Sequence, residues 1–344
     1  MKKALIGMSG GVDSSAAAYL TIQQGYTCIG ATMKLWADVS ADAEMVARKL
    51  GMEFYHFDLS RQFREAVVEP FVCSYEQGLT PNPCIACNRH LKFGLFLELA
   101  DSLGCSHVVT GHYARITEEN GRFLLKKAAE ESKDQSYFLY RMTQQQLART
   151  LFPLGDLSKA EARAIAESQG FLNAQKRDSQ DICFIPDGDY MAFIRGFTGK
   201  TYEDGDFLDA EGNRVGRHHG AAGYTLGQRK GLGLAMGQPV YVCAKDMAAN
   251  TVTVGSEEQL MHNALKAEDW NFIAIDALTQ PLRVKAKTRS RQAEQPAWVY
   301  PGENGSATVV FDQPQRAITP GQAVVLYDGE TVVGGGTITG AFSC

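Results

Sequence analysis

The first third of the chain alternates short apolar runs with segments of helical character. The apolar runs lie at 4–6, 27–33, 53–58 and 106–110, and the helical segments begin near 14, 41, 62 and 91. Such alternation predicts an α/β fold, in which a parallel sheet is wrapped by helices and ligands bind at the carboxyl ends of the strands. A further helical portion is expected up to about Arg195, including a helix over 159–169 with a capping box at Ser158 and Glu161.

The pattern changes after Gly199, where helical periodicity gives way to short β-branched runs separated by Gly-rich turns. This texture predicts two small β domains that divide near 261–265. The expected domains are therefore 1–197 for the α/β part, and 198–262 and 263–344 for the two β parts. A chain of 344 residues with 44% hydrophobic residues is long enough to bury more than one core.

Composition says more about the environment in which the protein works than about what it does. The formal net charge of -5 gives no global sign of nucleic-acid binding, so such a role has to rest on local clusters of charge. No stretch approaches the roughly 20 apolar residues of a membrane span. The 8 cysteines are scattered without the features of a secreted disulfide framework, which favours reduced thiols in the cytoplasm.

The most informative segment joins the first apolar run to the first helix. Gly10 and Gly11 can adopt backbone angles closed to other residues, so successive N–H groups can converge on an anion at the helix N-terminus. Asp13 can orient a metal ion or the turn itself. For a lone Gly-Gly pair, the alternative is an ordinary strand-to-helix connection. The segment lacks the GK[ST] ending of the common P-loop and the spaced glycines of a dinucleotide fingerprint, and SGGVDSS resembles the pyrophosphate loop of the ATP pyrophosphatases.

Two cysteines, Cys84 and Cys87, follow the extended segment 80–83 and precede an apparent helix from Arg89. A helix end and the cationic residues at 89, 90 and 92 favour thiolate over thiol at Cys87. A zinc half-site and a redox CxxC pair are the alternatives. Cys183 also has cations nearby, but its apolar neighbours make a buried strand cysteine equally natural.

Cationic side chains alternate with small or apolar ones between positions 283 and 291. The cations are Arg283, Lys285, Lys287, Arg289 and Arg291. A period of two predicts that all five project from one face of a strand. A charge run is usually a solvated face. Five like charges repel one another, however, unless carboxylates or phosphates meet them, and a nucleic-acid backbone supplies phosphates.

Further motifs occur in order over nearly the whole chain. They are Thr32-Met33-Lys34 with Trp36, TPNPC, CNRHLKF, TGHYAR, KDQSYFL, DSQDICFI, YTLGQRKGLG and PQRAITPGQAVVLYDG. Together with SGGVDSS they resemble the bacterial tRNA-specific 2-thiouridylase family. The resemblance implies an N-terminal adenine-nucleotide α-hydrolase-like domain with a PP-loop, a small central β domain and a C-terminal β-barrel that binds tRNA. It also implies ATP-dependent replacement of the C2 oxygen of the wobble uridine, position 34, by sulfur through an adenylated intermediate, with release of AMP and pyrophosphate.

The same resemblance assigns roles to particular residues. Cys87 is the expected nucleophile and Cys183 the expected persulfide carrier. ATP, with Mg²⁺, is expected at Gly7, Met8, Ser9, Gly10, Gly11, Val12, Asp13, Ser14, Met33 and Gly111. Besides the five cations, contacts with tRNA are expected at Asn82, Pro83, Cys84, His112, Lys133, Asp134, Gln135 and Gln322. Without the resemblance, His112 would be interpreted as a hydrogen-bonded core histidine and Gln322 as a turn residue after Pro320-Gly321.

One departure from the family pattern affects the sulfur chemistry. Many relatives have aspartate where this chain has Cys84, so the chain offers three thiols, Cys84, Cys87 and Cys183. Three cysteines can hold a [4Fe–4S] cluster whose fourth iron binds hydrosulfide. The third thiol favours the cluster over the persulfide, because in a persulfide-only enzyme a thiol beside the nucleophile risks a Cys84–Cys87 disulfide, and both routes stay open at this point. The expected partners are a sulfur-donor or sulfur-relay protein and the tRNAs for Lys, Glu and Gln, with no membrane partner.

Two other classes of function fit part of these features. An adenylating ligase or amidotransferase shares the pyrophosphate loop, but it has no need of the paired thiols Cys87 and Cys183 or of the basic strand. A non-catalytic RNA-binding or iron–sulfur scaffold has no need of an intact SGGVDSS loop. The sequence therefore predicts an ATP-dependent tRNA sulfurtransferase.

Overall fold

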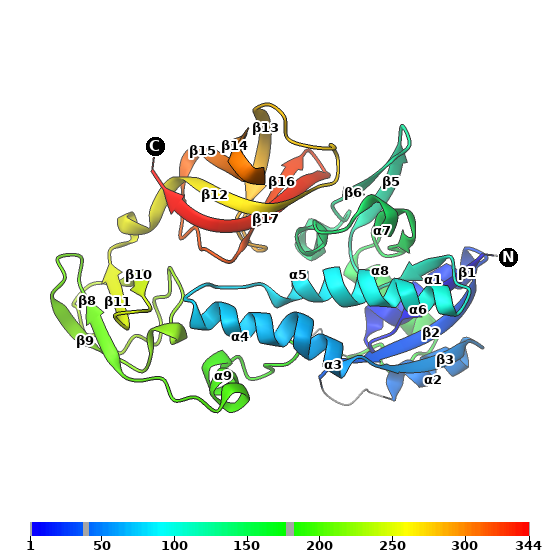
Figure 1. Ribbon diagram of the computed structural model, residues 1–344. Helices are drawn as coiled ribbons and strands as arrows, with labels where there is room; N and C mark the ends of the chain where they lie inside the picture. Colours follow the sequence, from blue (N-terminus) through cyan, green and yellow to red (C-terminus); the bar gives the residue numbers. More distant parts are fainter. Residues whose placement is uncertain (1, 37–40, 177–181, 344) are drawn as a thin grey trace.

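The computed structural model describes residues 2–36, 41–176 and 182–343, which form three structural units. The first unit is a helix-wrapped parallel sheet, the second a small four-stranded mixed sheet, and the third a β-barrel. Figure 1 shows the barrel, in yellow to red, over the long helices of the first unit, with the central unit beside them.

The first unit is built on five parallel strands in the order β3-β2-β1-β4-β7. These strands are β1 (Lys3–Gly7), β2 (Thr27–Lys34), β3 (Glu53–Asp58), β4 (His107–Val109) and β7 (Thr150–Leu151). Helices of this unit are α1 (Val12–Gln23), α2 (Asp42–Lys49), α7 (Gln144–Ala148), α8 (Lys159–Ser168) and α9 (Tyr190–Thr198). The predicted α/β fold is confirmed. Parallel strands need crossover connections, and here helices supply them.

Two long helical segments run from this sheet towards the central unit (Figure 1). One comprises α3 (Ser60–Phe63), the π-helical segment η1 (Arg64–Val68) and α4 (Glu69–Glu76). The other comprises α5 (Pro83–Cys87), the π-helical segment η2 (Asn88–Leu95) and α6 (Phe96–Ser102). The second segment therefore carries both cysteines of the CxxC pair on a helix.

The helical portion expected up to Arg195 is wrong between 115 and 126. These residues form a hairpin, β5 (Arg115–Glu119) and β6 (Arg122–Lys126), which pairs with strand β17 (Thr331–Phe342) of the barrel. Its two-residue turn is Asn120-Gly121, and both residues have positive φ, 51° and 76°. Asn-Gly is the pair that such a tight hairpin turn favours, so the sequence did hold the signal. The short turns η3 (Glu131–Lys133) and η4 (Ser136–Leu139) follow.

The two predicted β domains are confirmed. The central unit contains β8 (Gly205–Leu208), β9 (Arg214–His218), η5 (Ala221–Gly223), β10 (Tyr241–Asp246), β11 (Thr251–Gly255) and η6 (Glu257–Leu260). The last unit contains β12 (Met261–Phe272), β13 (Leu282–Lys287), β14 (Gln295–Pro301), η7 (Glu303–Gly305), β15 (Ala307–Arg316), β16 (Ala323–Asp328) and β17 (Thr331–Phe342). Because β12 pairs with both β15 and β17, six strands close into a barrel.

The barrel and the first unit share one hydrophobic core. A single cluster of buried side chains includes Leu5 of β1 and Val325 and Tyr327 of β16. Tyr137, between the two units, donates a hydrogen bond to the carbonyl oxygen of Ala323 at 2.9 Å. Burial of apolar surface is the main favourable term in folding, so this shared core holds the two units in one arrangement.

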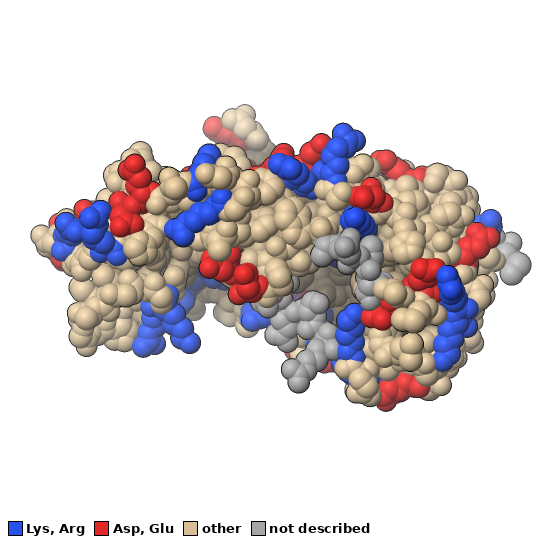
Figure 2. All heavy atoms as spheres, turned by 90° about the horizontal axis from the view of Figure 1, so that it is seen from below, with Lys and Arg blue, Asp and Glu red and all other residues tan. Residues whose placement is uncertain are grey.

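None of the helices in the described ranges combines the length and apolar character that a bilayer crossing requires. On the face shown in Figure 2, lysine and arginine side chains are interspersed with aspartate and glutamate instead of forming one basic area. On this face a polyanion would therefore meet small groups of cations and no single basic area.

We expect Arg122→Ala to loosen the hairpin from the barrel. Arg122 donates hydrogen bonds of 2.6 Å to the carbonyl oxygens of Ile273 and Ile275 and to the carboxylate of Asp276. Loss of these charged hydrogen bonds should destabilise the protein by about 2 kcal/mol and lower the midpoint of thermal unfolding. Arg48→Ala is the control, because Arg48 makes only an exposed ion pair within α2, worth at most about 1 kcal/mol. Equal midpoints of thermal unfolding for the two variants would show that the hydrogen bonds of Arg122 do not hold the hairpin to the barrel.

Candidate active site

The phosphate loop connects the carboxyl end of β1 to the N-terminus of α1. Gly10 has a positive φ of 74°, which glycine adopts without strain. The hydroxyl groups of Ser14 and Ser15 both donate to the carbonyl oxygen of Gly11 at 3.0 Å, and Asn173 donates to the carbonyl oxygen of Gly10 at 3.0 Å. The N-cap residue of α1 is Gly11, which has no side chain that could cap the helix. The loop is thus shaped by its own contacts, and the first N–H groups of the helix point towards an anion site.

Asp13, in the first turn of α1, is held by two side chains. The ammonium of Lys159 lies 2.8 and 2.9 Å from its two carboxylate oxygens, and the hydroxyl of Tyr113 donates to one of them at 2.8 Å. The side chain of Lys159 is 13% exposed and that of Asp13 is 32% exposed, so water screens the pair only in part. The carboxylate therefore has one fixed orientation beside the loop.

Gly7, Met33 and Gly111 lie at or just after the carboxyl ends of β1, β2 and β4. A Cβ atom at Gly111 would lie 2.8 Å from both the carbonyl carbon of Asp13 and the nitrogen of Ser14. Only glycine allows the chain after β4 to approach the phosphate loop so closely. The structure thus brings the residues expected to bind ATP to one edge of the sheet.

The helix that carries Cys84 and Cys87 begins earlier than expected. Pro83 is its first residue, and Asn82 caps it by accepting a hydrogen bond from the N–H of Cys84 at 3.2 Å. The expected start at Arg89 is therefore wrong, because Asn82-Pro83 supplies both a cap and a proline at the first helical position. Cys84 lies in the first turn, and Cys87 lies in the second.

The three thiols lie near one another but differ in exposure. Cys87 is buried, whereas Cys84 and Cys183 are exposed, so the interpretation of Cys183 as a buried strand cysteine is wrong. Burial raises the pKa of Cys87, although Lys92 opposes that shift. Although water reaches Cys183, partial burial of its thiol raises the pKa to about 11, and the neighbouring Cys87 and Cys84 add to the shift. The predicted preference for thiolate at Cys87 is therefore wrong, because burial outweighs the nearby cation.

These sulfur atoms are not arranged as metal ligands. Within 2–36, 41–176 and 182–343, no three Cys, His, Asp or Glu side chains form a group that could hold a metal ion. A [4Fe–4S] cluster needs three thiolates at bonding distance from one cluster. The arrangement fits neighbouring thiols and does not fit a preformed cluster site.

The barrel contacts the loop that leads into α5. Gln322 donates to the carbonyl oxygen of Thr80 at 2.7 Å, and the N–H of Thr80 donates to the carbonyl oxygen of Pro320 at 3.0 Å. Gly321 has a φ of 89°, and a Cβ atom there would lie 2.9 Å from the nitrogen of Thr80. Gln322 is therefore more than a turn residue, because it fixes the backbone before the cysteine helix.

His112 lies in the interior next to the site. Its Nδ1 shares a 2.7 Å hydrogen bond with the hydroxyl of Thr110, and its ring packs against Phe93 and Phe152. Burial lowers the pKa of His112 well below its usual value, and the charge of Lys92 adds to the shift. The hydrogen-bonded core histidine considered as the alternative is what the structure contains, and its ring is neutral.

The segment 133–135 lies between the phosphate loop and the barrel. The side chain of Gln135 accepts a hydrogen bond from the N–H of Tyr113 at 2.9 Å. Asp134 accepts from the N–H of Ser136 at 3.1 Å and from its hydroxyl at 2.7 Å. Asp134 and Gln135 therefore hold the segment in place, and Lys133 is the cationic residue of the three.

A cavity of about 1070 Å³ lies between the first unit and the barrel. The first unit contributes residues 9, 11–13, 113, 131–135, 138 and 176 to its wall. The barrel contributes residues 285, 287 and 290–294. Lys285, Lys287 and Arg291 thus face the same space as the phosphate loop. Main-chain N–H groups on one wall and cations on the other suit a ligand that carries several phosphates.

The barrel aligns fewer cations than expected. β13 ends at Lys287, and the chain turns at Thr288. Arg289 instead donates to the carbonyl oxygen of Leu226 at 3.2 Å and to the hydroxyl of Thr319 at 2.7 Å. The prediction that all five cations share one strand face is therefore wrong, because Arg289 joins the central unit to the barrel.

The chain resembles known proteins along its whole length. Residues 2–187 match the tRNA methyl transferase HUP domain, 192–256 the tRNA methyl transferase PRC-barrel domain and 262–338 the aminomethyltransferase beta-barrel domain. Proteins named tRNA-specific 2-thiouridylase MnmA from Clostridioides difficile and Acetivibrio thermocellus are each 48% identical to it, over 98% of this chain and 98% and 99% of their own. The Treponema denticola protein of that name is 46% identical over 98% of this chain and 97% of its own. This chain belongs to the tRNA-specific 2-thiouridylase family.

Two residues at the site of this 2-thiouridylase family member were missed by sequence reasoning. Tyr113 and Lys159 meet Asp13 across 100 and 146 residues of chain. Tyr113 stands in the quoted TGHYAR motif, and Lys159 is the first residue after the capping serine of α8. Those signals identify a motif and the start of a helix. They do not indicate that the side chains of Tyr113 and Lys159 contact Asp13, which is distant in the sequence.

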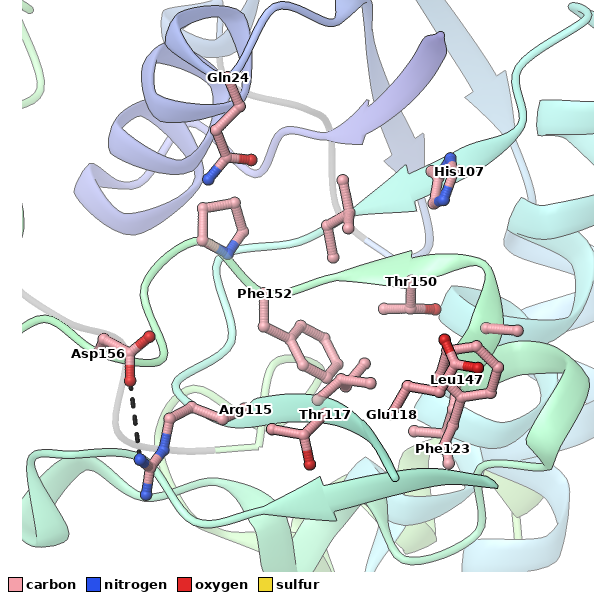
Figure 3. Close-up of a pocket in the computed structure, with 14 residues that line it drawn as sticks. Gln24, His107, Arg115, Thr117, Glu118, Phe123, Leu147, Thr150, Phe152 and Asp156 are labelled. Carbon is pink, nitrogen blue, oxygen red and sulfur yellow. Dashed lines mark ion pairs between the residues drawn. The ribbon is translucent and has the colours of Figure 1, made fainter. Parts of the chain in front are cut away.

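A second cavity of the 2-thiouridylase fold, of about 390 Å³, is remote from the phosphate loop (Figure 3). Gln24 on its wall follows the C-terminal end of α1, which has 12 residues and is therefore about 18 Å long. Figure 3 shows Phe152 within this cavity and Arg115 paired with Asp156 beside it. Its described lining includes no residue expected to bind ATP, sulfur or tRNA.

Gly111→Ala should displace the phosphate loop, because the new methyl group would lie within 3 Å of its main chain. We expect the Kd for ATP to rise at least tenfold, roughly 1.4 kcal/mol, in isothermal titration calorimetry. Gly196→Ala in α9 is the matched control, since a Cβ atom there meets nothing within 4 Å. Wild-type affinity for ATP in Gly111→Ala would show that the close approach is unimportant.

Proposed function

We propose that this protein transfers sulfur to C2 of the wobble uridine, position 34, of tRNA in an ATP-dependent reaction that passes through an adenylated uridine. The observation that carries the proposal is the single cavity whose walls are the phosphate loop and the barrel cations Lys285 and Lys287. The names of the family members support it. We assign catalysis to residues 1–197, a linking role to 198–262 and tRNA binding to 263–344, and we place the reaction in the cytoplasm.

The first step makes a leaving group. A uridine carbonyl oxygen leaves poorly, so O2 attacks the α-phosphorus of ATP, pyrophosphate departs, and the oxygen becomes part of AMP. The N–H groups around Gly10 and Gly11, at the positive end of α1, stabilise the charge that develops on pyrophosphate. Met33 and Gly111, at the neighbouring strand ends, border the adenosine.

Magnesium fits this site as a companion of ATP. In nucleotide enzymes Mg²⁺ is usually bound by one or two carboxylates together with the phosphates, and Asp13 is the carboxylate on the loop. The ion would supply charge neutralisation at the phosphates. Lys159, which lies 2.8 Å from Asp13, adds a second positive charge beside the same groups.

Sulfur delivery uses the neighbouring thiols Cys87 and Cys183. A donor or relay protein loads Cys183 as a persulfide, whose terminal sulfur attacks C2 of the adenylated uridine and expels AMP. Cys87, which loses its thiol proton in this step, then attacks the Cys183 sulfur. The S–S bond to the uridine breaks, 2-thiouridine departs and takes up the proton, and a Cys87–Cys183 disulfide remains for a cellular reductant. A [4Fe–4S] cluster on Cys84, Cys87 and Cys183 is the competing route. We place it second because the described side chains form no three-ligand group.

The residues expected at the tRNA site divide between contact and positioning. Asn82, Pro83 and Cys84 at the start of α5 face the target base. Phosphates of the tRNA meet Lys133, Lys285, Lys287 and Arg291, whereas Asp134, Gln135, His112, Arg289 and Gln322 hold the surrounding segments in place. The expected acceptors are the tRNAs for Lys, Glu and Gln.

Asp13→Asn should stop adenylation and spare tRNA binding. The variant keeps the shape of the side chain but removes the charge that orients Mg²⁺ and pairs with Lys159. We expect tRNA-dependent pyrophosphate release to fall about 100-fold or more, while the Kd for tRNA in filter binding stays close to the wild-type value. Asp156→Asn, at an exposed carboxylate beside the second cavity, is the control. Undiminished pyrophosphate release by Asp13→Asn would show that the phosphate loop is not part of the active site.

Cysteine variants separate the two routes of sulfur delivery. If Cys183 carries a persulfide, Cys183→Ser should still release pyrophosphate with tRNA but form no 2-thiouridine, and Cys84→Ala should keep most of the thiolation activity. If a cluster is used, anaerobically prepared protein should hold about four irons per chain, and Cys84→Ala should lose both iron and activity. Iron analysis and mass spectrometry of the tRNA nucleosides distinguish these outcomes.

A further inference from the structure

A row of exposed side chains continues from the cavity onto the outer face of the barrel. On β13, Lys287 and Lys285 line the cavity, and Arg283 is the next outward residue of the same strand face, since Val284 and Ala286 between them are buried. The distance along the strand from Lys287 to Arg283 is about 13 Å. The cationic face of β13 therefore extends beyond the space in which the reaction takes place.

Two large aromatic side chains stand beside this end of β13. Trp298 of β14 lies directly across from Arg283 in the strand pairing, and the guanidinium of Arg283 is 5.7 Å from the centre of its indole ring. Tyr300 is the next outward residue of β14. Trp298 is 41% exposed and Tyr300 is 40% exposed. Both rings therefore present apolar surface to water, and neighbouring exposed apolar residues mark a binding site more often than single ones do.

Arg283 is fixed at the edge of this aromatic pair. Its two terminal nitrogens donate to the two carboxylate oxygens of Asp312 on β15, at 2.7 and 2.5 Å. A bidentate pair of this kind holds the guanidinium plane in one orientation. Asp312 offsets the positive charge of Arg283. Lys285 and Lys287 make no ion pair with any residue that the structure describes. The surface is therefore cationic at its cavity end and aromatic at its outer end.

We propose that Trp298 and Tyr300, with Arg283, form a stacking platform for an unpaired RNA base, a second contact for the tRNA whose wobble uridine enters the cavity. This inference rests on the proposed function. A tRNA is far larger than a cavity of about 1070 Å³, so its loop must continue over the neighbouring surface. Cations that meet the backbone and aromatic rings that stack on bases are the combination by which proteins bind single-stranded RNA.

The charge of the surface favours RNA over a protein partner. Exposed Trp, Tyr and Arg side chains also occur at the centres of protein interfaces. Such centres are depleted in lysine, whereas here two lysines lead from the platform directly to the phosphate loop. The same cations complement an RNA backbone along their whole length.

The test measures tRNA affinity and its salt dependence in the full-length protein. Trp298→Ala should raise the Kd for tRNA about 5- to 150-fold, and Trp298→Phe should restore most of the affinity, because a phenyl ring still stacks. The slope of log Kd against log salt should stay unchanged in Trp298→Ala, since no phosphate contact is lost, whereas Lys285→Glu should flatten it by about one unit for each lost contact. Tyr55→Ala, at an exposed aromatic residue of β3 outside this surface, is the matched control.

A fluorescence measurement reports the stacking directly. In Trp36→Phe with Trp270→Phe, Trp298 is the one remaining tryptophan of the 3 in the chain, and saturating tRNA should quench its emission. An unchanged emission, or wild-type affinity in Trp298→Ala while the wild type thiolates tRNA, would overturn the platform and leave the proposed function intact. Wild-type protein that neither binds nor thiolates tRNA would instead refute the proposed function. If Trp298→Ala keeps wild-type affinity for tRNA but accepts sulfur poorly from a donor protein, the surface binds that protein and the inference is overturned.

Discussion

The packing of the barrel against the helix-wrapped sheet is the constraint on which the site depends. One hydrophobic cluster runs from Leu5 in the sheet to Tyr327 in the barrel, and Gln322 holds the main chain of Thr80 immediately before the cysteine helix. If the barrel were displaced, the phosphate loop and the sulfur residues would remain in the first unit, but the cationic wall of the cavity would be lost. The hydrophobic effect thus assembles an active site whose chemistry is almost entirely polar.

Inside the site, burial and charge act in opposite directions. The Asp13–Lys159 pair is partly shielded from water, and Tyr113 donates a further hydrogen bond to the Asp13 carboxylate. Burial raises the pKa of Cys87 in spite of the nearby Lys92, and it lowers the pKa of His112 well below its usual value. The nucleotide end of the site therefore holds a fixed carboxylate–ammonium pair, whereas Cys87 and His112 are buried groups beside the single charge of Lys92. Negative charge brought in by ATP and tRNA falls where cations are already placed.

Local sequence signals were sufficient for much of the fold. The alternation of apolar runs and helices predicted the parallel sheet, and the change of texture after Gly199 predicted two β domains. Errors arose where two local signals competed. The Asn120-Gly121 turn marked a hairpin inside a stretch interpreted as helical, and Asn82-Pro83 started a helix before the expected residue. In the basic segment, alternation held through Lys287 and failed at Arg289, because a strand can end while its pattern of charges continues.

By itself the sequence determined the phosphate loop, the three thiols and the family, since these reside in contiguous residues whose chemistry and backbone needs can be read locally. Glycine at 10 and 11, for example, follows from the conformation of one turn. The tertiary structure alone decided that Lys159 meets Asp13, that His112 is buried and neutral, that Arg289 is a structural contact, and that Trp298 stands beside Arg283. Each of these outcomes depends on which side chains meet across more than ten residues of chain or on how much water reaches them. Distance and burial are properties of the packed molecule, and no local pattern encodes them.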